Sequence, residues 1–237
     1  MKLMHISDLH IGKKLFETSM LEDQRYILNR ILDLLDDERP DAVLIAGDVY
    51  DRVNPTADAM ELLDEFLSAL ALRGICTMII SGNHDSPERL AYARRFLENR
   101  NIHISPVYNG HIEPIVLSDA YGEVCFWLMP YVHPDSVGGF FADQTIRNAQ
   151  DAAQAVIGEM RVDPNKRNVI LSHQFIIGGT TSDSERRNIG TLENVDAALY
   201  DAFDYVALGH LHRPQNVGRA DGTMRYCGTP LVYSRTE

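Results

Sequence analysis

The sequence predicts an α/β fold that begins with βαβ units around a largely parallel sheet. Three short apolar runs alternate with segments of helical periodicity in the first half of the chain. Each run ends in a cluster of polar residues, as expected at the edge of such a sheet where ligands bind. We find no internal repeat, low-complexity tract or linker, so we expect one domain over residues 1–237.

The first half contains signals for three strands and three helices. The strands are expected over residues 2–7, 42–46 and 75–81. The helices are expected over residues 20–39, 56–73 and 87–99. Pro40 ends the first helix, while Thr56 caps the second and Gly74 ends it. Pro87 lies in the first turn of the third helix.

The second half is less regular. Residues 112–117 and 123–130 are expected to pair around a turn at Tyr121 and Gly122, and residues 145–160 form a helical pattern. Buried strands are expected over residues 168–172 and 205–208, followed by a hairpin of residues 216–219 and 223–227. A long polar loop spans residues 178–195, and loops of this length are usually functional.

Composition excludes several classes of protein. With 22 Lys and Arg against 34 Asp and Glu, the formal net charge is −12, so contact with phosphate requires a local basic patch or bound cations. Three widely spaced cysteines without a CxxC pair predict neither a disulfide framework nor a zinc–thiolate site, which fits the cytoplasm. The longest apolar run, residues 124–132, is far shorter than the roughly 18 residues of a membrane span, and the N-terminus does not resemble a signal peptide.

Five polar clusters at strand ends carry the chemistry. They are Ser7-Asp8-Leu9-His10, Gly47-Asp48-Val49-Tyr50-Asp51, Ser81-Gly82-Asn83-His84-Asp85, Ser172-His173 and Gly209-His210-Leu211-His212. The candidate metal ligands among them are Asp8, His10, Asp48, Asn83, His173, His210 and His212. Seven ligands are too many for one ion, but they form two sets of four if Asp48 is shared. Oxygen and imidazole ligands together suit Mn, Fe, Co or Zn. The alternative is a set of capped strand ends, which leaves the ligand types unexplained.

These clusters, in this order, resemble the motifs of the calcineurin-like metallophosphoesterases. The resemblance implies two packed mixed β-sheets flanked by helices, an αββα sandwich. It places Asp8, His10, Asp48 and His212 on one ion, and Asp48, Asn83, His173 and His210 on the other. It also implies that His84 contacts the scissile phosphate and that Asp85 orients the ring of His84. The alternative for His84 is a turn histidine held by Asp85.

A narrower resemblance covers nearly the whole chain. The segments HISDLHIGKKL, AGDVYDRVNPT, SGNHDSPERL, SDSERRNIGTLENV, DYVALGHLHRPQ and RYCGTPLVYS are similar to those of the bacterial SbcD nuclease family, relatives of the Mre-type double-strand-break nucleases. This implies a Mn²⁺-dependent 3′–5′ exonuclease on duplex DNA and an endonuclease on single strands and hairpins. The implied partners are DNA, the SMC-like ATPase SbcC, and a second copy bound through helices near residues 56–73 and 87–99, in a cytoplasmic, nucleoid-associated complex.

The chain departs from this family in two respects. Asp51 stands where archaeal and eukaryotic relatives carry His, so it is either part of the shell around the metals or a turn residue before Asn54-Pro55. Family members also continue into a capping domain and an ATPase-binding segment, which we expect to be absent here.

Basic residues near the motifs are candidate DNA contacts, with solvated surface charge as the alternative. They are Lys13, Lys14, Arg186, Arg187 and Arg213. Two rival functions share these motifs. One is a phosphoprotein phosphatase or cyclic-nucleotide phosphodiesterase, and the other is a binding module without activity. The complete ligand set argues against the second rival.

Overall fold

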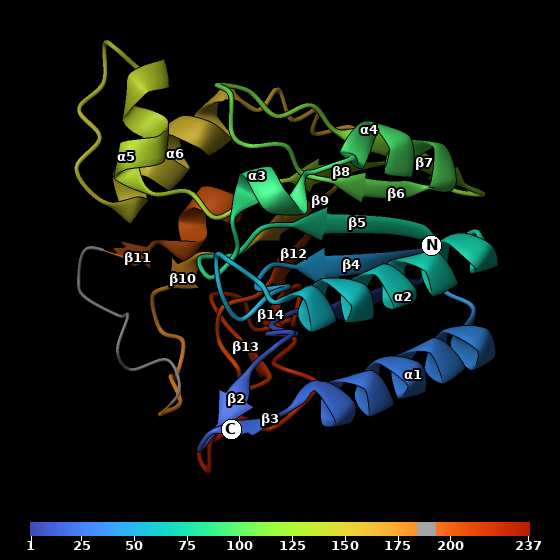
Figure 1. Ribbon diagram of the computed structural model, residues 1–237. Helices are drawn as coiled ribbons and strands as arrows, with labels where there is room; N and C mark the ends of the chain where they lie inside the picture. The colour runs from blue at the N-terminus through green and yellow to red at the C-terminus, as the bar shows by residue number, and fades with distance from the viewer. Residues whose placement is uncertain (184–192) are drawn as a thin grey trace.

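Two β-sheets packed face to face form the centre of the computed structural model, which describes residues 1–183 and 193–237 (Figure 1). The first sheet has the strand order β1-β4-β5-β6, and all its pairings are parallel. Its strands are β1 (Leu3–Ile6), β4 (Ala42–Ala46), β5 (Cys76–Ile80) and β6 (Ile102–Ile104).

The second sheet is mixed, with the strand order β13-β14-β12-β9-β8-β7. Its central pairings are parallel, while β13 and β7 join the two edges in antiparallel orientation. Its strands are β7 (Ile115–Asp119), β8 (Gly122–Leu128), β9 (Arg167–Ser172), β12 (Tyr205–Leu208), β13 (Gln215–Asn216) and β14 (Met224–Tyr226). Two small pairs complete the strands: β2 (Lys14–Leu15) with β3 (Thr18–Ser19), and β10 (Phe175–Ile176) with β11 (Asn194–Val195).

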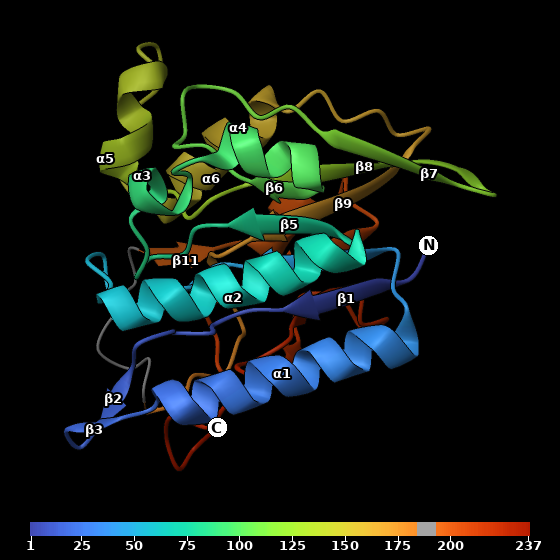
Figure 2. The ribbon, with the colours of Figure 1, turned by 45° about the vertical axis from the view of Figure 1, so that its right-hand side comes forward.

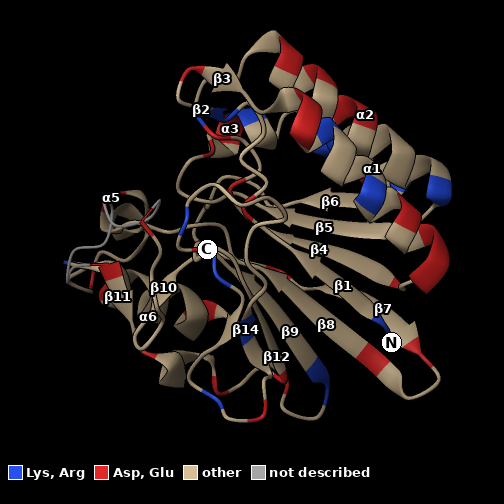
Figure 3. Ribbon diagram, turned by 90° about the horizontal axis from the view of Figure 1, so that it is seen from below, with Lys and Arg blue, Asp and Glu red and all other residues tan. Residues whose placement is uncertain are grey.

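Helices cover the outer faces of both sheets. Helices α1 (Leu21–Glu38) and α2 (Ala57–Arg73) run side by side over the first sheet (Figure 2), and Figure 3 shows acidic residues along both. Helix α6 (Ala149–Glu159) packs on the second sheet. The short helices are α3 (Pro87–Leu90), α4 (Arg94–Leu97), α5 (Pro134–Val137), η1 (Glu98–Arg100), η2 (Gly138–Phe140) and η4 (Ala197–Tyr200). None of the described helices combines the length and apolar character needed to cross a membrane.

Alternating side chains on the strands separate the core into three layers. In β4, Val43 and Ile45 face α1 and α2, whereas Leu44 faces the second sheet. In β8, Phe126 faces the first sheet, whereas Trp127 faces the layer that contains α6. The predicted αββα sandwich is therefore confirmed, with the detail that its first sheet is wholly parallel rather than mixed.

The third predicted helix, over residues 87–99, is wrong as a continuous element. The segment forms α3, then a turn, then α4 and η1. Ala93 interrupts it because its backbone has a φ of 59°, in the left-handed region that a helix excludes. The second helix agrees with its end signals: the Thr56 side chain accepts a hydrogen bond from the Ala59 amide, and Gly74 ends the helix with a φ of 67°.

Candidate metal centre

The carboxyl ends of five parallel strands meet where the two sheets face each other. Strands β1, β4 and β5 belong to the first sheet, and β9 and β12 belong to the second. The seven predicted ligands follow these strands directly: Asp8 and His10 after β1, Asp48 after β4, Asn83 after β5, His173 after β9, and His210 and His212 after β12. Asn83 is half-buried and the other six are buried. The fold thus brings all seven together from five separate segments.

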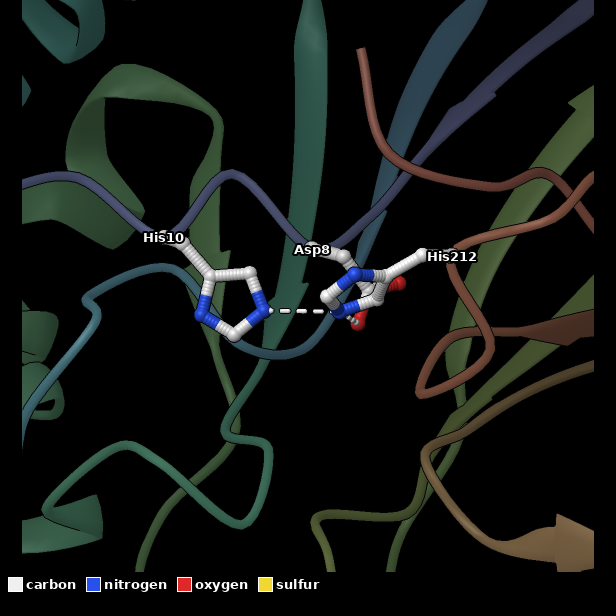
Figure 4. A group of neighbouring side chains, drawn as sticks. All are labelled: Asp8, His10 and His212. Carbon is white, nitrogen blue, oxygen red and sulfur yellow. Dashed lines mark hydrogen bonds and ion pairs between the residues drawn. The ribbon is translucent and has the colours of Figure 1, made fainter. Parts of the chain in front are cut away.

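Asp8, His10 and His212 form one group, shown in Figure 4. The Nε2 atoms of His10 and His212 are 3.0 Å apart, and Nε2 of His212 is 4.0 Å from Oδ1 of Asp8. Two imidazole nitrogens that face each other at this distance cannot both present bare lone pairs. The space between them therefore suits a proton or a cation.

A second group surrounds Asn83. Its Oδ1 is 3.1 Å from Nε2 of His173 and 3.0 Å from Nδ1 of His210. Oδ2 of Asp48 is 3.3 Å from Nε2 of His173 and 3.6 Å from Nε2 of His10. One carboxylate oxygen therefore lies between the two groups, where a shared ligand is needed.

The donor atoms are spaced as metal ligands are. Two ligand atoms that lie about 2.1 Å from an ion and at right angles to each other are about 3.0 Å apart. The contacts within the two groups include separations of 3.0, 3.0, 3.1 and 3.3 Å. Carboxylate, amide oxygen and imidazole donors favour a divalent ion of the first transition row. The residues present therefore fit a pair of divalent ions.

The backbone orients His173 for such a role. Its Nδ1 lies 2.7 Å from the carbonyl oxygen of Ala46. A carbonyl oxygen only accepts hydrogen bonds, so Nδ1 carries a hydrogen and Nε2 is the atom turned toward Asp48 and Asn83.

Glycines let the backbone pass close to these side chains. A Cβ on Gly82 would lie 2.1 Å from Oδ1 of Asp48, and a Cβ on Gly209 would lie 1.9 Å from the carbonyl oxygen of Ala46. Neither distance is sterically allowed, so both positions require glycine.

The loops that carry the ligands hold unusual backbone conformations. Asp8, His10 and Asp48 have φ values of 54°, 44° and 48°, in the left-handed region that costs free energy for residues with a Cβ. Hydrogen bonds between the two loops maintain this arrangement, since the Asp8 amide donates to the Gly47 carbonyl and the His10 amide donates to the Asp48 carbonyl, each at 3.0 Å. Such strain is concentrated at functional sites.

The sequence pattern of calcineurin-like phosphoesterases matches residues 1–214. The chain belongs to this family. It is also similar to proteins named as the SbcD chain of the SbcCD nuclease. The protein from Staphylococcus saprophyticus is 38% identical, with all of this chain matched to 62% of that protein, and the protein from Staphylococcus epidermidis is 39% identical, with 63% of it matched. The chain thus spans less than two thirds of the length of these relatives.

Solved structures share the fold of this phosphoesterase at low sequence identity. The protein TT1561 of Thermus thermophilus aligns with a TM-score of 0.58 and 12% identity, over 96% of this chain and 89% of that one. A dimetal phosphatase from Danio rerio aligns with a TM-score of 0.57 and 13% identity, over 97% and 87% of the two chains. At these identities the comparison supports the fold alone.

His84 lies beside the metal centre of the phosphoesterase, but Asp85 does not orient it. The ring of His84 is 4.9 Å from that of His10, centroid to centroid, and its Nδ1 is 3.0 Å from the carbonyl oxygen of Asp51. The carboxylate of Asp85 instead accepts hydrogen bonds from the amides of Val49, Tyr50 and Gly82. Asp85 therefore joins the loops after β4 and β5. The expectation that Asp85 orients the His84 ring is therefore wrong, and the backbone carbonyl of Asp51 contacts the ring instead.

Asp51 lies in the shell around the metal centre. Its Oδ1 is 3.5 Å from Nδ1 of His10 and 2.9 Å from Nζ of Lys13. Lys13 is therefore paired and largely buried, with 18% of its side chain exposed, which weakens its case as a DNA contact. Lys14 and Arg213 are exposed. Arg186 and Arg187 lie outside the described residues.

Burial and neighbouring charges shift the protonation equilibria of the centre. Burial lowers the pKa of His10, and burial together with the charge of His173 lowers the pKa of His210 to about 4. Burial also acts to lower the pKa of His173, but the carboxylates of Asp48 and Asp8 outweigh it and raise that pKa to about 9. Burial and the charge of Asp48 raise the pKa of Asp85 to about 6. The neighbouring carboxylates thus favour the protonated form of the His173 ring, whereas burial favours the neutral form of His10 and His210.

Three further residues support the centre without belonging to any of the five clusters: Gln24, Tyr233 and Glu237. The Gln24 amide donates to the carbonyl of His10 at 2.7 Å, and the Tyr233 hydroxyl donates to the carbonyl of Leu9 at 2.7 Å. Nδ1 of His212 lies 3.0 Å from Oε1 of Glu237. None of the three is among the residues predicted from sequence, because they belong to no short motif at the strand ends. The available signals are that Tyr233 lies in the segment RYCGTPLVYS, which carries the family resemblance, and that Glu237 follows it closely.

Proposed function

We propose that this phosphoesterase is a metal-dependent DNA nuclease. The observation that carries the proposal is the convergence of seven oxygen and nitrogen donors from both sheets, with His84 beside them. The names of the relatives that match the full chain support a nuclease subunit. The proposed activities are 3′–5′ exonuclease on duplex DNA and endonuclease on single strands and hairpins.

The residues would hold two divalent ions, for which we propose Mn²⁺, with Fe, Co or Zn as alternatives in a purified sample. Asp8, His10, Asp48 and His212 would bind one ion. Asp48, Asn83, His173 and His210 would bind the other. When bound, such ions activate water and offset the negative charge that develops on phosphate.

His84 is proposed to assist departure of the ribose oxygen. The Asp51 carbonyl accepts a hydrogen bond from Nδ1, so the opposite ring nitrogen, Nε2, is left to face a substrate. His84 is half-buried and therefore open to solvent on one side. A protonated ring could donate its Nε2 hydrogen to the leaving oxygen, and proton transfer of this kind contributes about 10²–10⁴-fold to rate.

The binding of DNA to this acidic chain depends on local charge. Lys14 and Arg213 are exposed next to ligand-bearing loops and are proposed to contact phosphate, as are Arg186 and Arg187. Two bound divalent ions would add roughly four positive charges at the same place. This explains how DNA can approach a chain with a net charge of −12.

The proposal is tested by digestion of end-labelled duplex DNA with Mn²⁺, with and without a chelator. The variant His84→Ala is expected to keep both metal ions but to lose about 10²–10⁴-fold in rate. His111→Ala, at an exposed histidine elsewhere, is the matched control and is expected to cut at the wild-type rate. Cleavage by metal-loaded His84→Ala at the wild-type rate would refute the role of His84. Cleavage of a small phosphodiester without cleavage of DNA would favour the phosphatase or cyclic-nucleotide alternative.

We also propose that the chain pairs with a second copy and with an SMC-like ATPase of the SbcC type in the cytoplasm, close to the nucleoid. The dimer is supported by an apolar groove between α2 and the α3–α4 segment. Leu72, Tyr92 and Phe96 at this groove have 88%, 82% and 69% of their surface exposed. Light scattering of Phe96→Glu should report a monomer if this groove is the dimer interface, and an unchanged mass would refute the proposed surface.

A further inference from the structure

Glu237 reaches the metal centre from a segment that none of the five motifs includes. Its side chain has only 2% of its surface exposed, and its Oε1 lies 3.0 Å from Nδ1 of His212. A buried carboxylate is costly unless hydrogen bonds or opposite charge compensate it. Its position against a histidine of the centre therefore needs an explanation.

The contact selects which nitrogen of His212 faces the centre. An ionised carboxylate only accepts hydrogen bonds, so Nδ1 of His212 carries a hydrogen. Nε2 is then the acceptor nitrogen of the ring, and it is the one turned toward His10 and Asp8. Oδ1 of Asp51 lies 3.5 Å from Nδ1 of His10, which is an ion-pair distance without a hydrogen bond. Both histidines of the Asp8 group thus have a carboxylate on the Nδ1 side, at hydrogen-bond distance for His212 and farther away for His10, whereas Nδ1 of His173 donates to a backbone carbonyl.

Tyr233 holds Glu237 in this position. Its amide donates to Oε2 of Glu237 at 2.5 Å, and its hydroxyl donates to the carbonyl of Leu9 at 2.7 Å. The Tyr233 ring lies edge-on to His10 and His212, with centroid distances of 5.7 and 6.1 Å. Gln24 donates both to the Tyr233 hydroxyl and to the His10 carbonyl. One hydrogen-bonded network therefore connects Glu237 to the loop that carries Asp8 and His10.

We propose that Glu237 is a positioning residue for the metal centre: it fixes His212 with Nε2 directed at the ion held by the Asp8 group, and Tyr233 keeps the carboxylate in place. The proposal rests on the proposed function, because it takes His212 as a metal ligand. Loss of such an outer partner commonly weakens metal affinity by about 10–100-fold. Because His212 belongs to the Asp8 group and not to the Asn83 group, the effect should fall on one ion of the two.

The test compares Glu237→Gln and Glu237→Ala with wild type, with Glu123→Gln as the matched control. Glu123 is an exposed carboxylate paired with Lys166 at 2.7 Å, so it has a partner but lies on a strand remote from the ligands. Mn²⁺ titration followed by calorimetry measures the affinity of each ion. Nitrogen-15 NMR of the histidine rings in metal-free protein measures the tautomer of His212 independently of metal or activity.

We expect Glu237→Ala to weaken one Mn²⁺ by about 10–100-fold and Glu237→Gln by less, with the second ion and the control unchanged. His212 should be protonated at Nδ1 in wild type and should change to a mixture of tautomers in Glu237→Ala. An unchanged tautomer, or equal weakening of both ions, would overturn the proposal. If wild type binds no Mn²⁺ at all, the proposed function fails, and the tautomer measurement still decides whether Glu237 orients His212. Should Glu237→Ala not fold, Mn²⁺ titration of Glu237→Gln measures the affinity, and a wild-type spectrum without hydrogen on Nδ1 of His212 would overturn the proposal.

Discussion

At the scale of single residues, the close approach of Gly82 to Asp48 leaves no space for a side chain at position 82. A Cβ at position 82 would lie 2.4 Å from the Asp48 amide nitrogen as well as 2.1 Å from its Oδ1. We expect Gly82→Ala to lower the free energy of unfolding by about 1–3 kcal/mol, as overpacking does, and to weaken metal binding because Asp48 must move. Urea unfolding in a chelator and Mn²⁺ titration measure the two effects.

Gly158 provides the control for this substitution. It lies in α6, and a Cβ there would meet nothing within 4 Å. Gly158→Ala is therefore expected to raise stability by about 0.4–1 kcal/mol through the unfolded chain. If both substitutions destabilise equally, the steric explanation for Gly82 is wrong.

His5 makes stability depend on pH. The residue is half-buried in β1, its Nδ1 is 3.1 Å from the Tyr205 hydroxyl, and its Nε2 is buried without a hydrogen-bond partner among the described residues. Burial lowers the pKa of His5 from 6.5 to about 4, even though Asp8 acts in the opposite direction. Between these two values the unfolded chain binds a proton that the folded chain excludes. The contribution of His5 to the free energy of unfolding is therefore fully present above pH 6.5. It decreases by ~1–3 kcal/mol as the pH falls toward 4.

The measurement is urea unfolding of metal-free protein at several pH values. His5→Leu should flatten the profile between pH 4 and 6.5, whereas the same substitution at the exposed His111 should leave it unchanged. An identical slope in wild type and His5→Leu would assign the acid sensitivity to other groups.

A site residue can be found from sequence when a local rule connects its place in the chain to its place in the fold. Asp8 and His10 are identifiable because they follow a strand directly, and parallel strand ends converge. Glu237 is not, because its contact with His212 depends on the path of a segment without regular structure. The partners of Asp85 cannot be predicted from sequence either, because they are backbone amides, which every residue type except proline has.

At the scale of elements, two helices end in the same backbone conformation with different residues. Arg39 ends α1 with a φ of 46°, and Gly74 ends α2 with a φ of 67°. A residue with a Cβ in the left-handed conformation destabilises the folded state by about 1–2 kcal/mol. Replacing it with glycine removes this cost, but glycine also gains freedom in the unfolded chain, which offsets about half of the benefit. Arg39→Gly should therefore raise the free energy of unfolding by about 0.5–1 kcal/mol, and Gly74→Ala should lower it by a similar amount. Denaturant unfolding checks both, and a loss of stability in Arg39→Gly would show that the Arg39 side chain matters more than its backbone.

The same elements show what a sequence pattern can predict about a boundary. Pro40 and Gly74 indicate both helix ends within a residue or two because each acts through its own backbone. Ala93 has no such intrinsic effect, and only its place in the folded chain gives it a positive φ. The break between α3 and α4 therefore cannot be read from the helical periodicity of residues 87–99.

At the scale of the whole molecule, the metal centre connects the two halves of the sandwich. Asp8, Asp48 and Asn83 follow strands of the first sheet, while His173, His210 and His212 follow strands of the second. Without metal, the buried carboxylates of Asp8 and Asp48 depend on backbone hydrogen bonds and on nearby histidine rings for compensation. Bound cations would replace that compensation and tie both sheets at one edge, in addition to the apolar layer between them.

Removal of metal should therefore lower the melting temperature of the whole domain. At a free Mn²⁺ concentration of 100 times the Kd, one ion stabilises the folded state by about 2.7 kcal/mol, which corresponds to roughly 5–10 °C for a domain of this size. Scanning calorimetry with Mn²⁺ and with a chelator measures the difference, and the melting temperature should rise with Mn²⁺ concentration. His173→Ala, which removes one ligand of the Asn83 group, should retain part of the shift through the Asp8 group. Because the ligands span both sheets, the transition should move as one cooperative event, and a separate early transition confined to one half would contradict the role of the centre as a link between the sheets.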